Sequence, residues 1–171
     1  PMTPPSSNRP QAKSARSDLL GLLIEQKAIT EEQAELVRRR VRRAQVSPHQ
    51  AVIDLGFASE EQVYRALADC NGLSFTTLSE KDIDEDAQAK VSAKVAFHYR
   101  LVPMKLDKQT LTAAFDSPPT MRNREHLRVL LGVRLNPVIT TPSCVRRALK
   151  TVYGVGADTV MQIRKDRNFQ D

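Results

Sequence analysis

Apolar residues recur at the spacing of an amphipathic helix through the first half of the chain. The positions that carry this pattern in the first two predicted helices are Leu19, Leu22, Leu23, Ile24, Ala34, Val37 and Val41. Between these helices, Thr30 and Gln33 have the spacing of a capping box, in which each side chain accepts a hydrogen bond from the other residue's backbone N–H. The pattern predicts a helical hairpin that begins near Ser17 and ends near Ala44.

The same pattern occurs a second time, 29 residues further along the chain. Ser47–Gly56 parallels Asp18–Lys27, and Ser59 with Gln62 repeats the capping box. The inward positions expected in the helix after Ser59 are Val63, Ala66, Leu67 and Cys70. Because each hairpin is too short to bury its apolar face alone, we expect the two hairpins to pack together as a four-helix unit.

The second half of the chain alternates short strands with helices. Strands are predicted at residues 101–106, 110–116 and 134–140, with a hairpin turn between the first two and a sheet edge or strand end at Pro137. A short extended run is expected at 73–77, and one short helix within 79–90. Further helices are expected within 92–100, at 121–132 and at 142–153. The order β–β–α–β–α predicts a small layer of helices on a sheet.

These elements predict an α+β protein with four parts. Residues 1–16 are expected to form a flexible arm that carries a tag scar at Pro1, and 155–171 a weakly ordered tail. Residues 17–72 are expected to form the helical tandem-repeat subdomain, and 73–154 the small α/β subdomain. The oligomeric state of the protein stays open.

The composition of the chain indicates the cellular compartment and the kind of binding partner to expect. The 171 residues carry a net charge of +6, which favours acidic partners unless it only solvates the surface. The two cysteines, Cys70 and Cys144, lie far apart and form no disulfide framework, so we expect a reducing cytoplasm. No apolar run approaches the roughly 18–20 residues of a membrane span. We therefore expect a cytoplasmic protein.

Catalytic and metal-binding motifs are missing from the sequence. No GxxxxGK[ST], GxSxG or HExxH occurs, and His49, His98 and His126 do not have metal-ligand spacing. We expect no enzyme activity, no metal and no cofactor in this chain.

The run "RRRVRR" is the main charged feature. With Val37 and Val41 inward, Arg38, Arg39, Arg42 and Arg43 fall on the outward arc of their helix. This arc is interpreted as a solvated face, as a docking surface for an acidic protein, or as a nucleic-acid contact. Nucleic acid is the weakest of the three, because no aromatic platform accompanies the arginines.

Several stretches together resemble one family. They are "DLLGLLIEQKAITEEQ", "VIDLGFASEEQVYRALADCNGLSF", "VAFHYRLVPMKLDKQTLTAAFDSP" and "VYG". The most specific part is an A-x-x-Y-R-x-x-P phrase at 96–103, followed by A-x-x-D-x-P at 113–118. This chain resembles the N-terminal domain of type II secretion and type IV pilus assembly ATPases from Ser17 to Gly154. The resemblance implies a domain that caps the motor and docks onto partner proteins at the cytoplasmic membrane.

A subset of that family binds cyclic di-GMP through two tandem copies of a motif similar to RLGxxLLxxGLLxxxxLxxxLxxQ. In this chain the copies run 18–41 and 47–70. Asp18 and Ser47 stand at the arginine positions, and Val41 and Cys70 at the glutamine positions. The apolar framework persists at Leu23, Ile24, Val52 and Ile53. Because Asp18 would repel a dianion, the resemblance implies a degenerate ligand site.

We interpret the chain as a non-catalytic regulatory domain that docks onto a protein of a secretion, pilus or motility machine. The arginine arc and the four-helix unit are the expected docking surfaces. The alternatives are a module that senses cyclic di-GMP or a related dinucleotide by altered contacts, and nonspecific nucleic-acid binding. The identity of the partner stays open, as does whether the natural protein continues into an ATPase domain.

Overall fold

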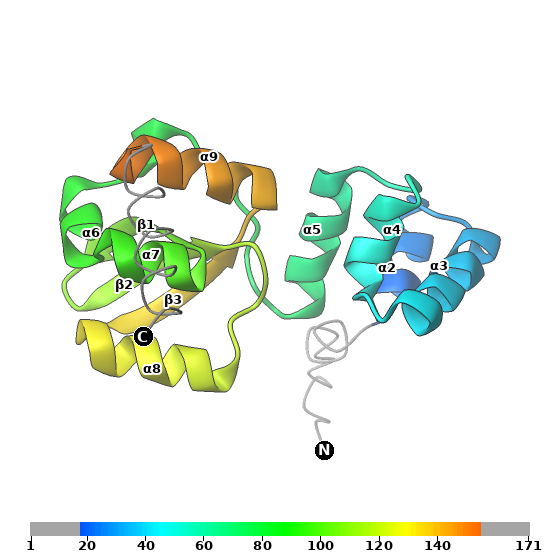
Figure 1. Cartoon of the computed structure of the whole chain (residues 1–171), viewed down its shortest axis with the longest axis horizontal. Helices are drawn as coiled ribbons and strands as arrows, with labels where there is room; N and C mark the ends of the chain where they lie inside the picture. The colour runs from blue at the N-terminus through cyan, green and yellow to red at the C-terminus, as the bar shows by residue number, and fades with distance from the viewer. Residues whose placement is uncertain (1–17, 155–171) are drawn as a thin grey trace, which may run out of the picture. The chain divides into compact units, whose positions relative to one another are not determined.

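A computed structural model of the protein describes residues 18–154, and the arm predicted at 1–16 and the tail predicted at 155–171 lie outside these described residues. The chain divides into two compact units between Leu73 and Ser74 (Figure 1). The first unit is helical and the second contains the sheet, so the predicted α+β class is confirmed.

The N-terminal unit consists of α2 (Leu19–Glu25), α3 (Glu31–Ala44), α4 (Pro48–Asp54) and α5 (Glu60–Cys70). Helix α2 contacts α3, α4 and α5, while α4 contacts both α3 and α5. The two hairpins therefore share one core, and the predicted four-helix unit is confirmed. Its fully buried side chains include Leu23, Ala34, Val37, Ala51, Val52, Val63 and Ala66.

Both predicted capping boxes are present. Thr30 Oγ1 accepts a hydrogen bond from the Gln33 backbone N–H at 3.1 Å, and Gln33 Oε1 accepts one from the Thr30 N–H at 2.9 Å. Ser59 and Gln62 form the same pair of bonds at 3.1 and 3.0 Å. These bonds satisfy backbone donors that a helix leaves unpaired at its start, so the sequence correctly marks where α3 and α5 begin.

The C-terminal unit is built on a three-stranded sheet with the order β1 (Leu101–Asp107), β2 (Thr110–Phe115), β3 (Arg134–Ile139). Strands β1 and β2 are antiparallel and are joined by a two-residue turn in which Lys108 has φ 56. Strand β3 runs parallel to β2 after the crossover helix α8 (Met121–Leu131), as a parallel pair requires. The short extended run predicted at 73–77 extends the sheet through a bridge between Phe75 and Ile139.

Helices cover the sheet in two groups. Helices α6 (Glu85–Lys90), α7 (Ala93–Tyr99) and α9 (Pro142–Tyr153) contact β1, whereas α8 contacts β3. Figure 1 shows α8 and α9 on opposite sides of the sheet. The Tyr153 hydroxyl donates to the Val91 carbonyl at 2.8 Å, and burial raises the pKa of Tyr153 to about 12. This contact holds the end of α9 against the segment between α6 and α7.

The acidic segment 79–90 differs from the single short helix that we predicted. A 3₁₀ turn at Glu80–Asp82 precedes α6. The Asp82 carboxylate accepts hydrogen bonds from the backbone N–H and the hydroxyl of Ser79, at 2.9 and 3.0 Å. These bonds close a separate local turn, because an aspartate side chain competes with the helical backbone for the same donors.

Candidate docking surface and ligand site

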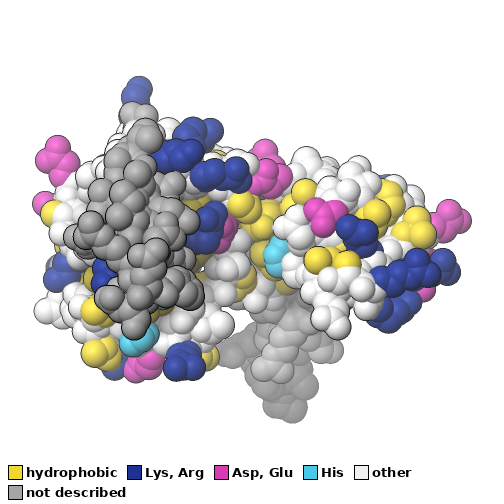
Figure 2. All heavy atoms as spheres, viewed as in Figure 1, with side chains coloured by type: hydrophobic (Ala, Val, Ile, Leu, Met, Phe, Trp, Pro, Cys, Tyr) yellow, Lys and Arg dark blue, Asp and Glu magenta, His cyan; other side chains and the backbone are white. Residues whose placement is uncertain are grey.

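The arginine arc of α3 consists of Arg38, Arg39, Arg42 and Arg43, and all four side chains are exposed. Val37, on the opposite face of the helix, is fully buried, so the inward and outward faces follow the expected helical period. Figure 2 shows Lys and Arg side chains gathered over α3. Leu36 lies beside this arc and is 48% exposed, which adds an apolar contact to the cationic surface.

Only one acidic side chain pairs with the arc within the described residues. Glu35 lies 3.4 Å from Arg38 and 3.9 Å from Arg42, measured between carboxylate oxygen and guanidinium nitrogen. All three side chains are 44–66% exposed, and pairs of this kind contribute only about 0.3–0.5 kcal/mol on a helix surface. The arc therefore keeps most of its positive charge available.

The degenerate dinucleotide motif contributes its apolar framework to the core. Leu23 and Val52 are fully buried, and Ile24 and Ile53 are half-buried. These apolar side chains contribute to the core that the two hairpins share.

The four end positions of the motif lie at helix termini. Asp18 is the exposed N-cap of α2, Val41 lies in the last turn of α3, Ser47 is the N-cap of α4, and Cys70 ends α5. Because α2 packs on α5, the start of the first copy lies near the end of the second. No cationic side chain occupies any of the four positions.

The pKa of the Cys70 thiol reflects the proximity of Asp18. Burial, the charge of Asp18 and the charge of Asp69, in that order, raise the pKa of its thiol. The thiol therefore stays neutral beside a carboxylate, and a phosphodiester placed there would meet the negative charge of Asp18. Of the four end positions, Asp18 and Cys70 lie close together, and their chemistry does not suit a dianion.

Tyr64 is a buried residue that the sequence analysis missed. It is 3% exposed, and its ring contacts the His49 ring edge-on with centroids 5.6 Å apart. His49 Nε2 also lies 3.2 Å from Ser47 Oγ, so the start of the second copy is a small polar cluster. The helical period gave a signal for Tyr64, because it lies three residues before the inward Leu67, but tyrosine has only an intermediate preference for burial.

The two phrases that carry the family resemblance are joined by an ion pair. Arg100 Nε donates to Asp116 Oδ2 at 2.6 Å, connecting the end of α7 to the end of β2. Next to it, the Tyr99 hydroxyl lies 2.9 Å from His126 Nδ1 on α8. These polar side chains brace the sheet and its helices, so their role in this unit is structural.

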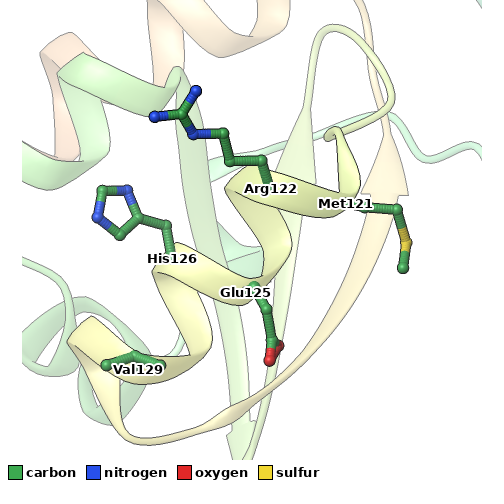
Figure 3. A pocket seen from close by; sticks show the side chains of 5 residues that line it. All are labelled: Met121, Arg122, Glu125, His126 and Val129. Atoms are coloured by element: carbon green, nitrogen blue, oxygen red, sulfur yellow. The ribbon is translucent and has the colours of Figure 1, made fainter.

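The outward face of α8 forms an open hollow of about 590 Å³, lined by Met121, Arg122, Glu125, His126 and Val129 (Figure 3). Arg122 and His126 point to one side of the helix, while Glu125 points away from them and pairs with Arg128 at 2.8 Å. Hydrogen bonds from Arg128 and its charge lower the pKa of Glu125. The five side chains do not converge on one point.

Residues 18–154 contain no group of three or more His, Cys, Asp or Glu side chains that could hold a metal ion. Among the helices described, none has the length and apolar character to cross a membrane.

A family comparison matches residues 71–159 to the MshEN domain. Among curated proteins, the bacteriophage adsorption protein B of Escherichia coli K12 is 32% identical over 91 residues, which are 53% of this chain and 12% of that protein. The type IV pilus assembly ATPase PilB of Thermus thermophilus is 25% identical over 133 residues, which are 77% of this chain and 15% of PilB. The matched part of this chain thus spans only a small fraction of either relative.

Solved structures extend the similarity to the whole described fold. A structure of MshE with cdg matches 81% of this chain and 100% of its own chain, with a TM-score of 0.71 and 25% identity. The N-terminal domain of XpsE matches 80% of this chain and 94% of its own, with a TM-score of 0.59 and 15% identity, which supports the fold alone. The family resemblance predicted from the sequence is confirmed.

Proposed function

This chain belongs to the MshEN domain family, and from that premise we propose that it is a non-catalytic regulatory domain that docks onto a protein partner. The partner is a component of a machine of the type II secretion or type IV pilus kind and presents an acidic face in the cytoplasm, at the inner membrane. The observation that carries this proposal is the arginine arc of α3, whose four guanidinium groups are exposed.

Guanidinium groups suit such a partner for two reasons. Their planar forks bind carboxylates with two parallel hydrogen bonds, and they remain charged at every cytoplasmic pH. Leu36, exposed one turn before Arg39 and Arg40, would supply the apolar contact that interfaces usually place beside a charged rim. A patch of one sign also steers an oppositely charged partner toward it.

Reversal of the arc tests this surface. Arg38→Glu, Arg39→Glu, Arg42→Glu and Arg43→Glu, combined in one variant, should abolish capture of the partner, because the acidic face would then meet like charge. The readout is affinity capture from cells of the source organism, followed by identification of the captured proteins by mass spectrometry. The expected captured protein is a cytoplasmic-membrane component of a secretion, pilus or motility machine.

A matched control distinguishes an effect of this surface from an effect of net charge. The control variant reverses four exposed cations of the C-terminal unit, namely Lys94, Lys105, Arg122 and Arg134. It changes the net charge by the same amount and should leave capture intact. Equal capture by both variants would rule out the arginine arc, and steeply salt-dependent binding to arbitrary DNA would favour nucleic acid as the partner.

Cyclic di-GMP binding is the second candidate function. It is supported by the similarity to MshE with cdg, at 25% identity over 81% of this chain. Against it stand the four end positions of the motif, which carry Asp18, Val41, Ser47 and Cys70 in place of arginine and glutamine. We expect no heat of binding when cyclic di-GMP is titrated into this protein in a calorimeter.

Restoring polar residues at the four end positions of the motif provides the positive control for this titration. A variant with Asp18→Arg, Val41→Gln, Ser47→Arg and Cys70→Gln would supply charge-assisted hydrogen bonds to the phosphates and hydrogen-bonding groups to the base edges. We expect this variant to bind cyclic di-GMP measurably. Binding by the unaltered protein would instead establish the second candidate without bearing on the arginine arc.

A further inference from the structure

Cys144 lies in the first turn of α9, surrounded by hydrogen-bond donors. Its backbone N–H donates to Thr141 Oγ1 at 3.2 Å, which fixes the turn, and Arg147 Nη2 donates to its sulfur at 3.6 Å. The same Arg147 nitrogen donates to the Leu78 carbonyl at 3.2 Å, so the guanidinium is held in place beside the thiol. Cys144 is half-buried, so part of the residue is accessible to solvent.

These surroundings stabilise the thiolate. Burial opposes ionisation of Cys144, but hydrogen bonds from Thr141, the Leu78 backbone and Thr140, together with the charge of Arg147, outweigh it and lower the pKa. The N-terminal end of α9 adds a favourable field for negative charge. Cys70, which is also half-buried, has a raised pKa, so the chain contains its own contrasting thiol.

A second observation at the same place is the buried hydroxyl of Thr140. Thr140 is 0% exposed, and apart from the Cys144 sulfur its Oγ1 has no hydrogen-bond partner among the described residues. A buried hydroxyl without a partner destabilises a fold unless an acceptor forms nearby. The Cys144 sulfur is the nearby group that can become such an acceptor when it carries negative charge.

A cationic hollow lies on the same helix as Cys144. It has a volume of about 300 Å³ and is lined by Ser143, Arg146, Arg147 and Lys150, all on α9. Figure 2 shows Lys and Arg side chains gathered over this helix. Arg147 belongs both to the lining of the hollow and to the contacts of Cys144, so its side chain connects the hollow to the sulfur.

We propose that Cys144 is a site of reversible thiol modification, in which the hollow lined by Arg146, Arg147 and Lys150 receives an anionic low-molecular-weight disulfide. The Cys144 thiolate attacks one sulfur of the disulfide RS–SR, and a new S–S bond forms between Cys144 and that RS group. The other sulfur leaves as RS⁻ with the electron pair of the broken bond and takes a proton from water. Cys144 is oxidised and the departing sulfur is reduced.

The first test compares the two thiols with the neutral reagent iodoacetamide across a pH series. The Cys70→Ser variant leaves Cys144 as the single thiol, and Cys144→Ser leaves Cys70. The rate for Cys144 should reach half its maximum at a lower pH than the rate for Cys70. At pH 7, Cys144 should react roughly three to four times faster than Cys70 for each pH unit that separates the two midpoints. This ratio already includes the lower intrinsic nucleophilicity of a thiolate with a lower pKa. Equal midpoints, or a higher one for Cys144, would overturn the proposal.

The second test addresses the hollow. In the Cys70→Ser background, glutathione disulfide, which is anionic, should modify Cys144 faster than cystamine, which is cationic, as measured by intact mass. Arg146→Glu with Lys150→Glu should reverse this order while leaving the iodoacetamide rate little changed. The same preference in the doubly reversed variant would rule out the hollow as the disulfide site. Thr140→Val serves as a further check, because loss of the hydroxyl should move the iodoacetamide midpoint of a still-folded protein to higher pH.

Discussion

Two equivalent positions of the tandem repeat share a backbone conformation but not a residue type. Lys27 has φ 60 and Gly56 has φ 71, each just after the first helix of its hairpin. A left-handed backbone suits glycine, whereas a residue with a Cβ is strained there by about 1–2 kcal/mol. Space around the position is not the reason for glycine, because no atom lies within 4 Å of a Cβ built on Gly56.

Exchanging the two residue types should therefore shift stability in opposite directions. Lys27→Gly should raise the free energy of unfolding by about 0.5–1 kcal/mol. This is the backbone strain that glycine relieves, reduced by the cost of ordering glycine, which has more conformational entropy in the unfolded chain. Gly56→Ala should lower the free energy of unfolding by about 1 kcal/mol. Urea denaturation followed by circular dichroism measures both, and a loss of stability in Lys27→Gly would contradict the argument.

At the scale of the element, the capping boxes determine where the long helix of each hairpin begins. In α5 the Ser59 hydroxyl accepts from the Gln62 backbone N–H, and the Gln62 side chain accepts from Ser59. Ser59→Ala should lower the free energy of unfolding by about 1 kcal/mol, because it leaves a helix N-terminal donor without its partner.

Thr151→Ala provides the matched control for that change. The Thr151 hydroxyl donates to the Arg147 carbonyl one turn earlier, within α9, at 3.0 Å. Its removal should leave stability within about 0.5 kcal/mol of the parent, because such a bond inside a helix adds little. If both variants lost the same stability in urea, the cap would have no special role.

In helix α8, the spacing of apolar residues does not determine which face is buried. Leu127 and Leu131 are buried, whereas Val129 and Leu130 are 72% and 56% exposed. All four are apolar, so the sequence alone allows more than one inward face. Packing against β3 selects the stripe that Leu127 and Leu131 share, because residues four apart lie on the same side of a helix.

At the scale of the whole molecule, the division at Leu73 and Ser74 leads us to propose that the two units unfold separately. Leu23 is 0% exposed in the core of the four-helix unit. Leu23→Ala should destabilise that unit by about 3 kcal/mol through lost burial and the cavity left behind.

Hydrogen exchange followed by mass spectrometry distinguishes the two units. Amides of α2–α5 should exchange faster in Leu23→Ala, while those of β1–β3 should keep their parental rates. Leu36→Ala, at a residue that is 48% exposed, should change neither unit measurably. Faster exchange throughout residues 18–154 would show that the chain unfolds as one cooperative unit.

The sequence by itself determined the features that depend on neighbours within about one helical turn. The capping boxes at Thr30 and Ser59, the strands and their hairpin, and the outward arginine arc all follow from local spacing. The family resemblance was also readable, because its phrases are contiguous in the chain.

Only the tertiary structure decided which distant residues meet. Asp18 acts on Cys70 because α2 packs on α5, and Arg147 bonds to Leu78 across 69 positions of the chain. The thiol of Cys144 and the hydroxyl of Thr140 acquire their chemistry from such contacts. Burial and electric field at a side chain depend on every element packed around it, so no pattern along the chain specifies them.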